Sequence, residues 1–308
     1  MTSEVRRAAQ MLRAGGLVAF PTETVYGLGA DAASEKAVAR LYEVKRRPLE
    51  HPVIVHFASS AGAFAWAADV PVPAKKLAEK YWPGPLTLIL KRSALAKDFV
   101  TGGQDTVGLR VPSHPVAQQL LKEFSGAIAA PSANRFGMVS PTTLAHVRED
   151  LGSDVELVLE GGPSEVGIES TIVDLSSGNA VLLRPGAITR RQIDEIVRVT
   201  GEQSSLRHSG GLERHYAPRT PARLMPTHEL DREIARLKDK VAVLAFSRPD
   251  ERVEFWLRMP RDAQSYAKKL YASLRELDRA GCAAILIEAP PAEPEWAAVR
   301  DRLERACG

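Results

Sequence analysis

The chain has 308 residues, and its 41 basic and 38 acidic side chains leave a formal net charge of +3. This near-balance differs from the strongly basic composition of a dedicated nucleic-acid-binding protein, so any anion site must be local. With 44% hydrophobic and 26% charged residues, the composition is typical of a folded globular protein. No apolar run approaches the ~20 residues of a membrane span, and the first twenty residues lack the apolar core of a signal peptide. We therefore expect a soluble, cytoplasmic protein.

The cysteines and histidines exclude common disulfide and metal arrangements. Cys282 and Cys307 are the only two cysteines, and they form no Cys-x-x-Cys spacing. The seven histidines form no His-Glu-x-x-His motif and no other ligand spacing. We therefore predict no disulfide framework and no metal site built from protein side chains.

The first two thirds of the chain predict alternating helices and strands. Arg6 to Arg13 is an expected amphipathic helix, and Leu17 to Phe20 is an expected strand that leads into a polar turn. A second helix begins at the N-cap Ser34 and must end by Pro48. Further strand candidates are 53–57, 86–90, 107–111, 127–130, 155–159, 171–173 and 181–183. This pattern indicates a mixed α/β domain.

A region without periodicity separates this part from a second one. Residues 199–220 are rich in Gly, Ser and Pro, which is typical of a linker. The elements expected beyond it are strands at 241–246 and 283–287 and helices at 262–280 and 296–306. We therefore predict a domain at 1–198, a linker at 199–220 and a small α/β domain at 221–308.

The sharpest local feature is the basic cluster Lys45-Arg46-Arg47 at a predicted helix end. Cations held at one turn can neutralise a triphosphate, and arginine adds a bidentate fork. The alternative is that basic residues simply suit the negative end of a helix dipole. On the cluster alone, this structural explanation is the favoured one.

A second feature is the apolar strand 127–130, which leads directly into Pro131-Ser132-Ala133-Asn134. Ligands of α/β folds sit at strand ends, where serine and asparagine offer a hydroxyl and an amide. Pro, Ser and Asn are also turn residues, so an ordinary turn is the favoured reading of this segment by itself.

A third feature is a strand that places Thr106, Gly108 and Arg110 on one face by alternation. A buried arginine needs an anionic partner, because an unpaired buried charge is costly. The partner of Arg110 is either a structural acid or a substrate carboxylate, and from these residues alone the structural acid is favoured.

Two apparent signals carry little weight. Gly27-Leu28-Gly29-Ala30-Asp31-Ala32 fits the loose G-x-G-x-x-A pattern, but the preceding strand ends at Phe20, too far from the first glycine for a dinucleotide-binding turn. His56 lies on an apolar strand, where a histidine is by default part of the core. The chain also contains no Walker A sequence, which excludes a P-loop at the level of motifs.

Taken together, these segments resemble the YrdC-type threonylcarbamoyl-AMP synthase family in its longer two-domain form. The family signature, K-x-R followed by S-x-N, is matched by Lys45-Arg46-Arg47 and Ser132-Ala133-Asn134. The surrounding matches are FPTETVYGLGA, RRPLEHPVIVH, WPGPLTL, DTVGLRVPSHP, VGIESTIVDL and LLRPGAIT. The resemblance resumes in the linker at His215-Tyr216-Ala217-Pro218, although His208-Ser209-Gly210-Gly211 replaces the usual S-P-G-M before it.

The resemblance implies a twisted open mixed sheet with a basic concave cavity, followed by a smaller Rossmann-like domain. It also implies an L-threonylcarbamoyladenylate synthase, which is a nucleotidyltransferase. Such an enzyme makes threonylcarbamoyl-AMP and pyrophosphate from L-threonine, bicarbonate and ATP, with Mg²⁺ accompanying the nucleotide. A downstream threonylcarbamoyl-transferring complex would then modify adenosine 37 of tRNA.

The resemblance also implies roles for individual residues. The expected nucleotide contacts, with Lys45 and Arg47 as the catalytic pair, are Lys45, Arg47, Thr106, Ser132, Asn134, Ser140, Arg184 and Ser209. The threonine pocket would be lined by Thr22, His56, Arg110 and the backbone of Ala130. Arg110 would hold the threonine carboxylate, His56 or Thr22 would bind its hydroxyl, and Tyr216 would belong to a lid over the cavity.

Two other functions remain open at this point. One is a double-stranded RNA or tRNA binder without catalysis, which the near-neutral charge disfavours. The other is a carbamoyl-transferring domain of the hydrogenase-maturation type, which shares the fold. Chains of that type carry additional zinc-finger regions, and the scarcity of cysteine argues against one here.

Overall fold

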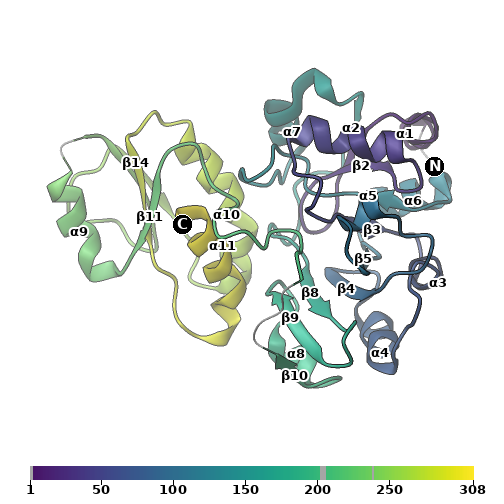
Figure 1. Cartoon of the computed structure of the whole chain (residues 1–308). Coiled ribbons are helices and arrows are strands. Elements are labelled where there is room, and N and C mark those ends of the chain that lie inside the picture. The colour runs from purple at the N-terminus through teal and green to yellow at the C-terminus, as the bar shows by residue number, and fades with distance from the viewer. Residues whose placement is uncertain (1–2, 202–205, 238) are drawn as a thin grey trace.

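The computed structural model describes residues 3–201, 206–237 and 239–308. Two sheets divide this part of the chain into two lobes (Figure 1). The first lobe, residues 3–201, contains a ten-stranded sheet, and the second lobe, residues 222–308, contains a four-stranded sheet. Both sheets carry helices, which confirms the predicted mixed α/β class with a second, smaller α/β part.

The first lobe has a mixed sheet in the order β10-β9-β8-β4-β5-β3-β6-β2-β1-β7. Its strands are β1 (Val18–Phe20), β2 (Gly27–Asp31), β3 (Ile54–His56), β4 (Leu86–Lys91), β5 (Thr106–Arg110), β6 (Ile128–Ala129), β7 (Leu157–Val158), β8 (Thr171–Asp174), β9 (Ala180–Arg184) and β10 (Val199–Gly201). Its α-helices are α1 (Ser3–Arg13), α2 (Glu35–Lys45), α3 (Ser60–Phe64), α4 (Val72–Tyr81), α5 (Asp98–Thr101), α6 (Pro115–Phe124), α7 (Leu144–Leu151) and α8 (Arg190–Asp194).

Helix α2 shows how local chemistry positions the basic cluster. Its N-cap is Ser34, as predicted, whose side chain accepts a hydrogen bond from the amide of Ala37. The helix ends at Lys45 and is followed by the C-cap Arg46, which adopts a left-handed conformation with φ of 54°. This reversal turns the backbone, so that Arg46 stays exposed while Arg47 is buried.

Strand β2 was not predicted, because its sequence, Gly-Leu-Gly-Ala-Asp, has low β propensity. It forms nevertheless, because it pairs with β1 on one side and β6 on the other. A Cβ atom on Gly29 would lie 2.9 Å from side-chain atoms of both Phe20 and Ile128. The glycines therefore allow close packing within the sheet, which confirms that they form no dinucleotide-binding turn.

The second lobe has a fully parallel sheet in the order β11-β14-β12-β13. Its strands are β11 (Ala222–Met225), β12 (Val241–Ala245), β13 (Phe255–Arg258) and β14 (Ala284–Glu288). Its α-helices are α9 (Thr227–Arg236), α10 (Ala263–Asp278) and α11 (Ala297–Cys307). Strands β12 and β14 and helices α10 and α11 were predicted, whereas β11 and β13 were not.

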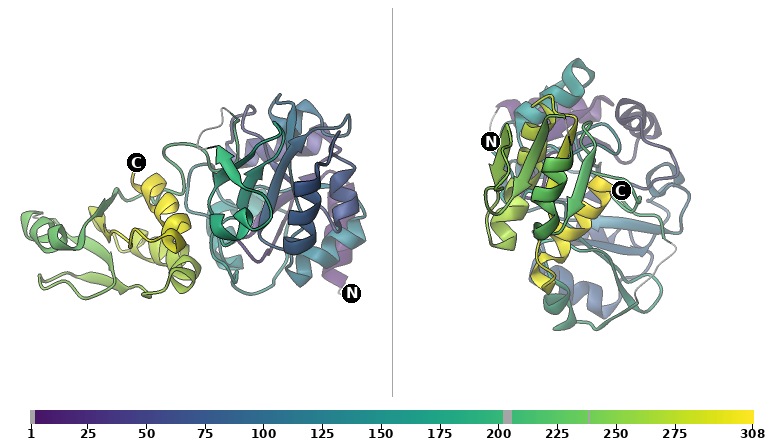
Figure 2. Two further views of the ribbon diagram at one scale, coloured as in Figure 1. Left: turned by 90° about the horizontal axis from the view of Figure 1, so that it is seen from below. Right: turned by 90° about the vertical axis from the view of Figure 1, so that its left-hand side faces the viewer.

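Helices of the second lobe form its contact with the first lobe. Figures 1 and 2 show α10 and α11 on the side of the second lobe that faces the first, with α9 on the far side. The segment between the lobes runs from the sheet edge to β11, and the first residues of the expected linker 199–220 belong to β10, which pairs with β9.

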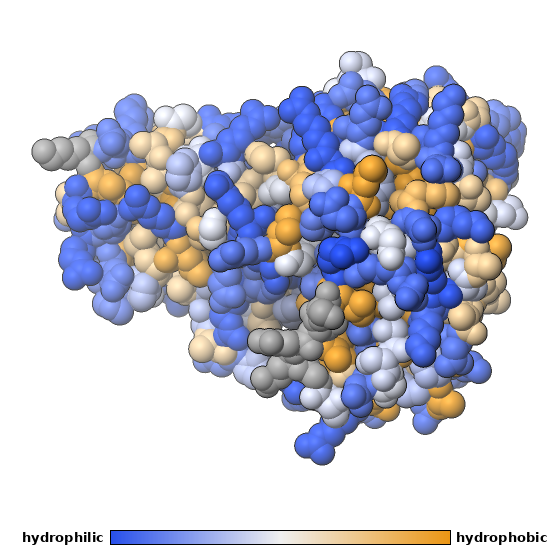
Figure 3. Space-filling model, in the orientation of Figure 1, coloured by the Kyte–Doolittle hydropathy of each residue, from blue (hydrophilic) through white to orange (hydrophobic). Residues whose placement is uncertain are grey.

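The molecular surface is mainly polar. On the face shown in Figure 3, hydrophilic residues predominate and hydrophobic ones are scattered over both lobes. Within the described residues, no helix combines the length and the apolar character that a membrane crossing requires.

Candidate active site

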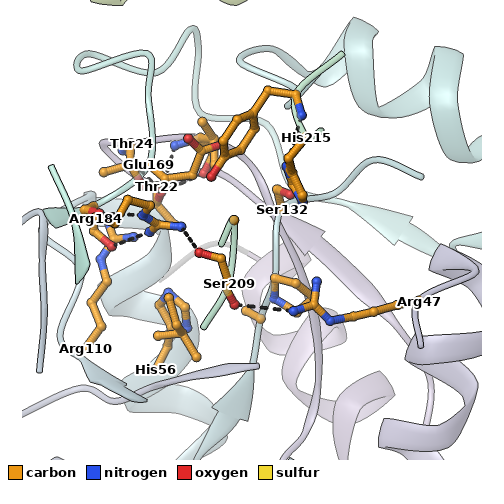
Figure 4. Close-up of a pocket in the computed structure, with 17 residues that line it drawn as sticks. Thr22, Thr24, Arg47, His56, Arg110, Ser132, Glu169, Arg184, Ser209 and His215 are labelled. Atoms are coloured by element: carbon orange, nitrogen blue, oxygen red, sulfur yellow. Dashed lines mark hydrogen bonds between the residues drawn. The ribbon is translucent and has the colours of Figure 1, made fainter. Parts of the chain in front are cut away.

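A cavity of about 50 Å³ lies where several strand ends and the interlobe segment converge (Figure 4). Its lining comes from the β1–β2 loop, the end of α2, strands β3, β5 and β9, the residues after β6, those before β8, and the interlobe segment. The lining residues are Thr22, Thr24, Val25, Arg47, Ile54, His56, Arg110, Ala130, Pro131, Ser132, Glu169, Ser170, Arg184, Ser209, Gly210, His215 and Tyr216.

Arg47 enters this cavity from the end of α2. Its Nε donates to the carbonyl of His51 at 3.1 Å, and its Nη2 donates to the carbonyl of Pro52 at 2.7 Å. The guanidinium also lies over the rings of Tyr42 and Phe136. These contacts fix the direction of the side chain but leave its positive charge without a carboxylate partner within the described residues.

Lys45 lies behind the cavity rather than on its wall. Its Nζ donates to the carbonyls of Ser132 and Asn134, both at 2.5 Å. Burial, followed by the charge of Arg47, holds the pKa of Lys45 well below its usual value. The Oγ of Ser132 donates to Asn134 Oδ1 at 2.6 Å. Lys45 and Asn134 thus brace the loop that presents Ser132 to the cavity.

Arg110 forms the structural pair that the residues alone favoured. Its Nη2 donates to Glu23 Oε1 at 2.7 Å, and the other Glu23 oxygen accepts from the amide of Ser113. Its Nε is buried without a hydrogen-bond partner among the described residues, and the side chain lines the cavity. Arg110 therefore has both a structural acid and donor capacity that a ligand can use.

His56 and Thr22 lie beside Arg110. His56 pairs with Arg110 in the register of β3 and β5, which brings both side chains to one end of the sheet. Burial, followed by the charge of Arg110, lowers the pKa of His56 to about 3, so the ring is neutral at pH 7. The Oγ1 of Thr22 donates to the carbonyl of Val25 at 2.6 Å. The amide of Ala130 donates to Ile54, so only its carbonyl oxygen can face a ligand.

Arg184 enters the cavity from β9, and Figure 4 shows it on the same side as Arg110. Its Nε and Nη2 donate to the carbonyl and hydroxyl of Ser170, at 3.0 and 3.1 Å. Its Nη1 donates to the carbonyl of Ser209 at 2.8 Å, and Arg47 Nη2 lies 3.4 Å from the hydroxyl of the same serine. Ser209 in the interlobe segment therefore accepts from both arginines, as Figure 4 shows.

Thirteen residues were expected at the site, and the structure brings nine of them to the cavity wall. The four that do not line it are Lys45, Thr106, Asn134 and Ser140. Lys45 and Asn134 support Ser132, and Ser140 donates to Glu169 at 2.5 Å. Thr106 lies at the far end of β5, about 13 Å from Arg110 at ~3.3 Å per residue. Alternation predicted the shared face of Thr106 and Arg110 but not their separation along the strand.

The expected list missed Glu169 and His215 of the cavity wall, and it missed Glu23, which pairs with Arg110 but does not itself line the cavity. Each acid lies inside a segment that matched the family, and each is flanked by apolar or small residues. A carboxylate in such surroundings needs a cationic partner, which is the signal that could have identified them. Within the described residues, no group of three or more His, Cys, Asp or Glu side chains could hold a metal ion.

Two protein-family models match consecutive parts of the chain. The Sua5/YciO/YrdC family model, described as "Telomere recombination", matches residues 10–186. A second model, "Threonylcarbamoyl-AMP synthase, C-terminal domain", matches residues 188–308.

Similar proteins match over nearly the whole chain. The threonylcarbamoyl-AMP synthase of Pyrococcus abyssi is 38% identical, with 99% of this chain and 94% of that protein covered. That of Bacillus subtilis is 37% identical, with coverages of 99% and 93%. The crystal structure of P. abyssi Sua5 complexed with L-threonine superposes with a TM-score of 0.90 at 36% identity, covering 98% of this chain and 94% of that one. The chain therefore belongs to the Sua5/YciO/YrdC family, in the two-domain form that carries the threonylcarbamoyl-AMP synthase C-terminal domain.

Proposed function

We propose that this protein is an L-threonylcarbamoyladenylate synthase, which converts L-threonine, bicarbonate and ATP into threonylcarbamoyl-AMP and pyrophosphate. The observation that carries the proposal is the convergence of Arg47, Arg110 and Arg184 on one cavity whose remaining polar groups are mostly hydroxyls. Such a site binds phosphates and a carboxylate and stabilises charge, which is how phosphoryl and adenylyl transfers are accelerated. The nearly full-length relatives named threonylcarbamoyl-AMP synthase support the same reaction.

The reaction proceeds in two steps at this cavity. The amine of threonine joins bicarbonate to give a carbamate and water, and a carbamate oxygen then attacks the α-phosphorus of ATP and expels pyrophosphate. Arg47 and Arg184 stabilise the phosphate charge, because each is held by neutral protein oxygens and keeps its charge for a ligand. Ser132, presented by Lys45 and Asn134, adds a hydroxyl to this wall, and the proton of that hydroxyl is donated to Asn134 Oδ1 in this structure.

Threonine binds on the side of Arg110. The buried Nε of Arg110 and the neutral ring of His56, whose Nδ1 has no partner among the described residues, provide polar atoms for an amino acid. Thr22 and the carbonyl of Ala130 complete this part of the wall. The P. abyssi relative was crystallised with L-threonine, which supports the assignment.

The segment 206–221 must move for ATP to enter. The cavity of about 50 Å³ is far smaller than the ~300–1,000 Å³ of sites that hold small-molecule ligands. Ser209 accepts hydrogen bonds from Arg47 and Arg184, the two groups assigned to the phosphates. The segment therefore acts as a lid, with Tyr216 as part of its buried face.

Mg²⁺ fits this site only as a companion of the nucleotide. The carboxylate of the wall, Glu169, is engaged by Arg302, and the nearby Glu23 is engaged by Arg110. The protein therefore supplies no free acidic ligand at the wall, and the phosphate oxygens of ATP would carry the ion.

The product is a reactive mixed anhydride, so it must pass to a second enzyme that transfers the threonylcarbamoyl group to tRNA. We place this pathway step in the cytoplasm, in line with two free cysteines, Cys282 and Cys307. We assign residues 1–198 to the catalytic domain, 199–220 to the linker and lid, and 221–308 to the second domain. The two sheets support a division into two parts, although β10 joins the first residues of the linker to the first sheet.

The test is to incubate the purified chain with ATP and bicarbonate and to measure pyrophosphate with and without L-threonine. We expect threonine-dependent release, and slower release with L-serine, because the missing methyl is worth about 1 to 3 kcal/mol in a pocket. Equal release with both amino acids would contradict the threonine assignment. Salt-dependent RNA binding without ATP consumption would instead support the non-catalytic alternative.

A further inference from the structure

The carboxylate of Glu169 occupies an unexpected position for an enzyme that binds a triphosphate. It lines the cavity in the segment before β8, next to Ser170, which holds Arg184. Its Oε1 accepts from Ser140 at 2.5 Å, and its Oε2 accepts from Tyr271 at 2.8 Å and from Arg302 Nε at 2.9 Å. An anion in this wall would repel ATP unless its charge were compensated.

The compensating charge comes from the other lobe. Arg302 belongs to α11 and is fully buried, with an exposed fraction of 0%. Arg302 also takes part in a chain of ion pairs on α11. Its Nη1 donates to Asp301, and Asp301 in turn accepts from Arg305. Although burial raises the pKa of Glu169, the charges of Arg302 and then Arg184 bring it below its usual value, so the carboxylate is ionised at pH 7.

Arg302 also contacts the lid. Its guanidinium carbon lies 5.3 Å from the centroid of the Tyr216 ring, in a cation–π arrangement. The neighbouring Arg305 supports the same segment, because its carbonyl accepts from the amide of His215 at 2.9 Å and its Nη1 donates to the carbonyl of Leu212 at 2.5 Å. One helix of the second lobe therefore holds both the acid of the cavity wall and the lid.

These contacts divide the charges of the site into two groups. Glu23 is matched by Arg110, and Glu169 is matched by Arg302, which lies outside the cavity. Within the described residues, Arg184 donates only to neutral oxygens, so its charge is not cancelled and is available to a ligand. Arg184 lines the same cavity, and its charge also acts on Glu169. Without Arg302, a pair between Glu169 and Arg184 would remove that arginine from the phosphates.

We propose that Arg302 is a positioning residue of the active site, supplied by the second lobe: it neutralises Glu169 and seats Tyr216, so that Arg184 stays available to the phosphates of ATP. This proposal rests on the proposed function in assigning the phosphates to Arg184. It gives the second lobe a direct part in nucleotide binding, beyond that of an attached domain.

The experiment compares ATP binding by calorimetry, and the KM values for ATP and threonine, among variants of the full chain. R302M is expected to weaken ATP binding tenfold or more and to raise the KM for ATP while the KM for threonine changes less than threefold. The double variant R302M/E169Q removes the acid together with its partner and is expected to recover ATP affinity to within about threefold of the wild type. R300M is the matched control and should match the wild type, because Arg300 lies on the same helix and, among the described residues, donates only to the carbonyls of Pro291 and Glu293.

The outcomes separate the proposal from a purely structural role. A folded R302M with unchanged ATP affinity, equal shifts in both KM values, or no recovery in R302M/E169Q would overturn it. If R302M does not fold, ATP binding by R302K and by R302M/E169Q tests the proposal instead. Both variants are expected to bind ATP within about threefold of the wild type. A tenfold loss of ATP affinity in either folded variant would overturn the proposal. Absent pyrophosphate release in the wild type would instead refute the proposed function, because ATP binding is measured independently.

Discussion

The three arginines of the cavity differ in the groups to which they donate hydrogen bonds. Arg110 is paired with a buried acid, whereas Arg47 and Arg184 donate only to carbonyl and hydroxyl oxygens within the described residues. Neutral acceptors orient a guanidinium without cancelling its charge, so a site of this kind is preorganised for an anion. This difference makes Arg47 a sharp test of the phosphate assignment.

We expect Arg47→Ala to lower the rate of adenylate formation by about 10² to 10³, as for the loss of one preorganised donor at a charged transition state. The measurement is threonine-dependent pyrophosphate release, with circular dichroism to show that the variant is folded. Arg46→Ala is the control, because Arg46 is the exposed neighbour. Near-normal turnover in Arg47→Ala, or an equal loss in Arg46→Ala, would refute the role.

His56 predicts a specific pH dependence of stability. Its pKa is lowered from 6.5 to about 3 by burial and then by the charge of Arg110. Between these two pH values, His56 is therefore neutral in the folded chain and protonated in the unfolded chain. The stabilisation is therefore fully present above pH 6.5 and is lost as the pH falls from 6.5 toward 3. We expect His56→Gln to reduce the slope of unfolding free energy between pH 6 and 5 by about 1 kcal/mol per pH unit. Urea titrations at several pH values measure it, and an unchanged slope would contradict the assignment.

At the residue scale, the sequence predicted which side chains belong to the site better than it predicted the groups with which they pair. The resemblance to the family predicted that Arg47, Ser132 and Arg110 share one site, whereas the local patterns alone favoured a helix end, an ordinary turn and a structural pair. The pairing of Glu169 with Arg302 could not be predicted, because 133 residues separate them and no local pattern encodes which helix of a second lobe packs on a strand end. The same holds for Lys45, which was expected to face ATP and instead braces Ser132.

Among the elements, the lid depends on one glycine. Gly210 has φ of +80°, and a Cβ atom there would lie 1.9 Å from the hydroxyl oxygen of Tyr216. That hydroxyl is buried without a hydrogen-bond partner among the described residues, so its contact with the glycine is one of van der Waals packing. The closed lid therefore requires a residue without a side chain at this position.

We expect Gly210→Ala to keep the lid from closing, which should lower pyrophosphate release at least tenfold and speed proteolysis of the segment 206–221. Gly15→Ala is the matched control, because Gly15 has φ of +82° but no atom within 4 Å of the added Cβ. That change should cost about 1 to 2 kcal/mol of stability for the left-handed conformation and leave the rate unchanged. Equal activity of the two variants would show that closure of the lid does not matter.

Elements with strong patterns were predicted, and those defined by their neighbours were not. The capped helix α2 and the apolar strands β4, β5 and β12 followed from sequence. Strand β2 is rich in glycine and depends on its pairing with β1 and β6. Strand β13 is a half-exposed edge strand whose alternation is weak, so it too required tertiary context.

At the scale of the whole molecule, the two lobes are joined by charges as well as by the lid. Arg275 of α10 donates to Asp150 of α7, and both side chains are largely buried. Arg275 also donates to the carbonyl of Val139 at 2.5 Å. Sequence reasoning predicted two domains from composition, but the contact between them depends on side chains that no linear pattern connects.

We expect Asp150→Asn to lower the free energy of unfolding by about 3 kcal/mol, because it leaves Arg275 buried and poorly compensated. The value lies at the low end of the range since Glu149 remains 3.6 Å from Arg275. Glu149→Gln is the control and should cost less than about 1 kcal/mol, as expected for a partly exposed pair. Denaturant unfolding of both variants decides the matter, and an equal effect would show that the buried pair does not join the lobes.

The central claim is that one cavity combines threonine, bicarbonate and ATP into a single product. Mass spectrometry of that product, made with ¹³C-labelled bicarbonate in a short incubation, tests it most directly. We predict an adduct that contains threonine, one labelled carbon and AMP, formed in step with pyrophosphate and lost in Arg47→Ala. An adenylate without the labelled carbon, or one formed without threonine, would contradict the account.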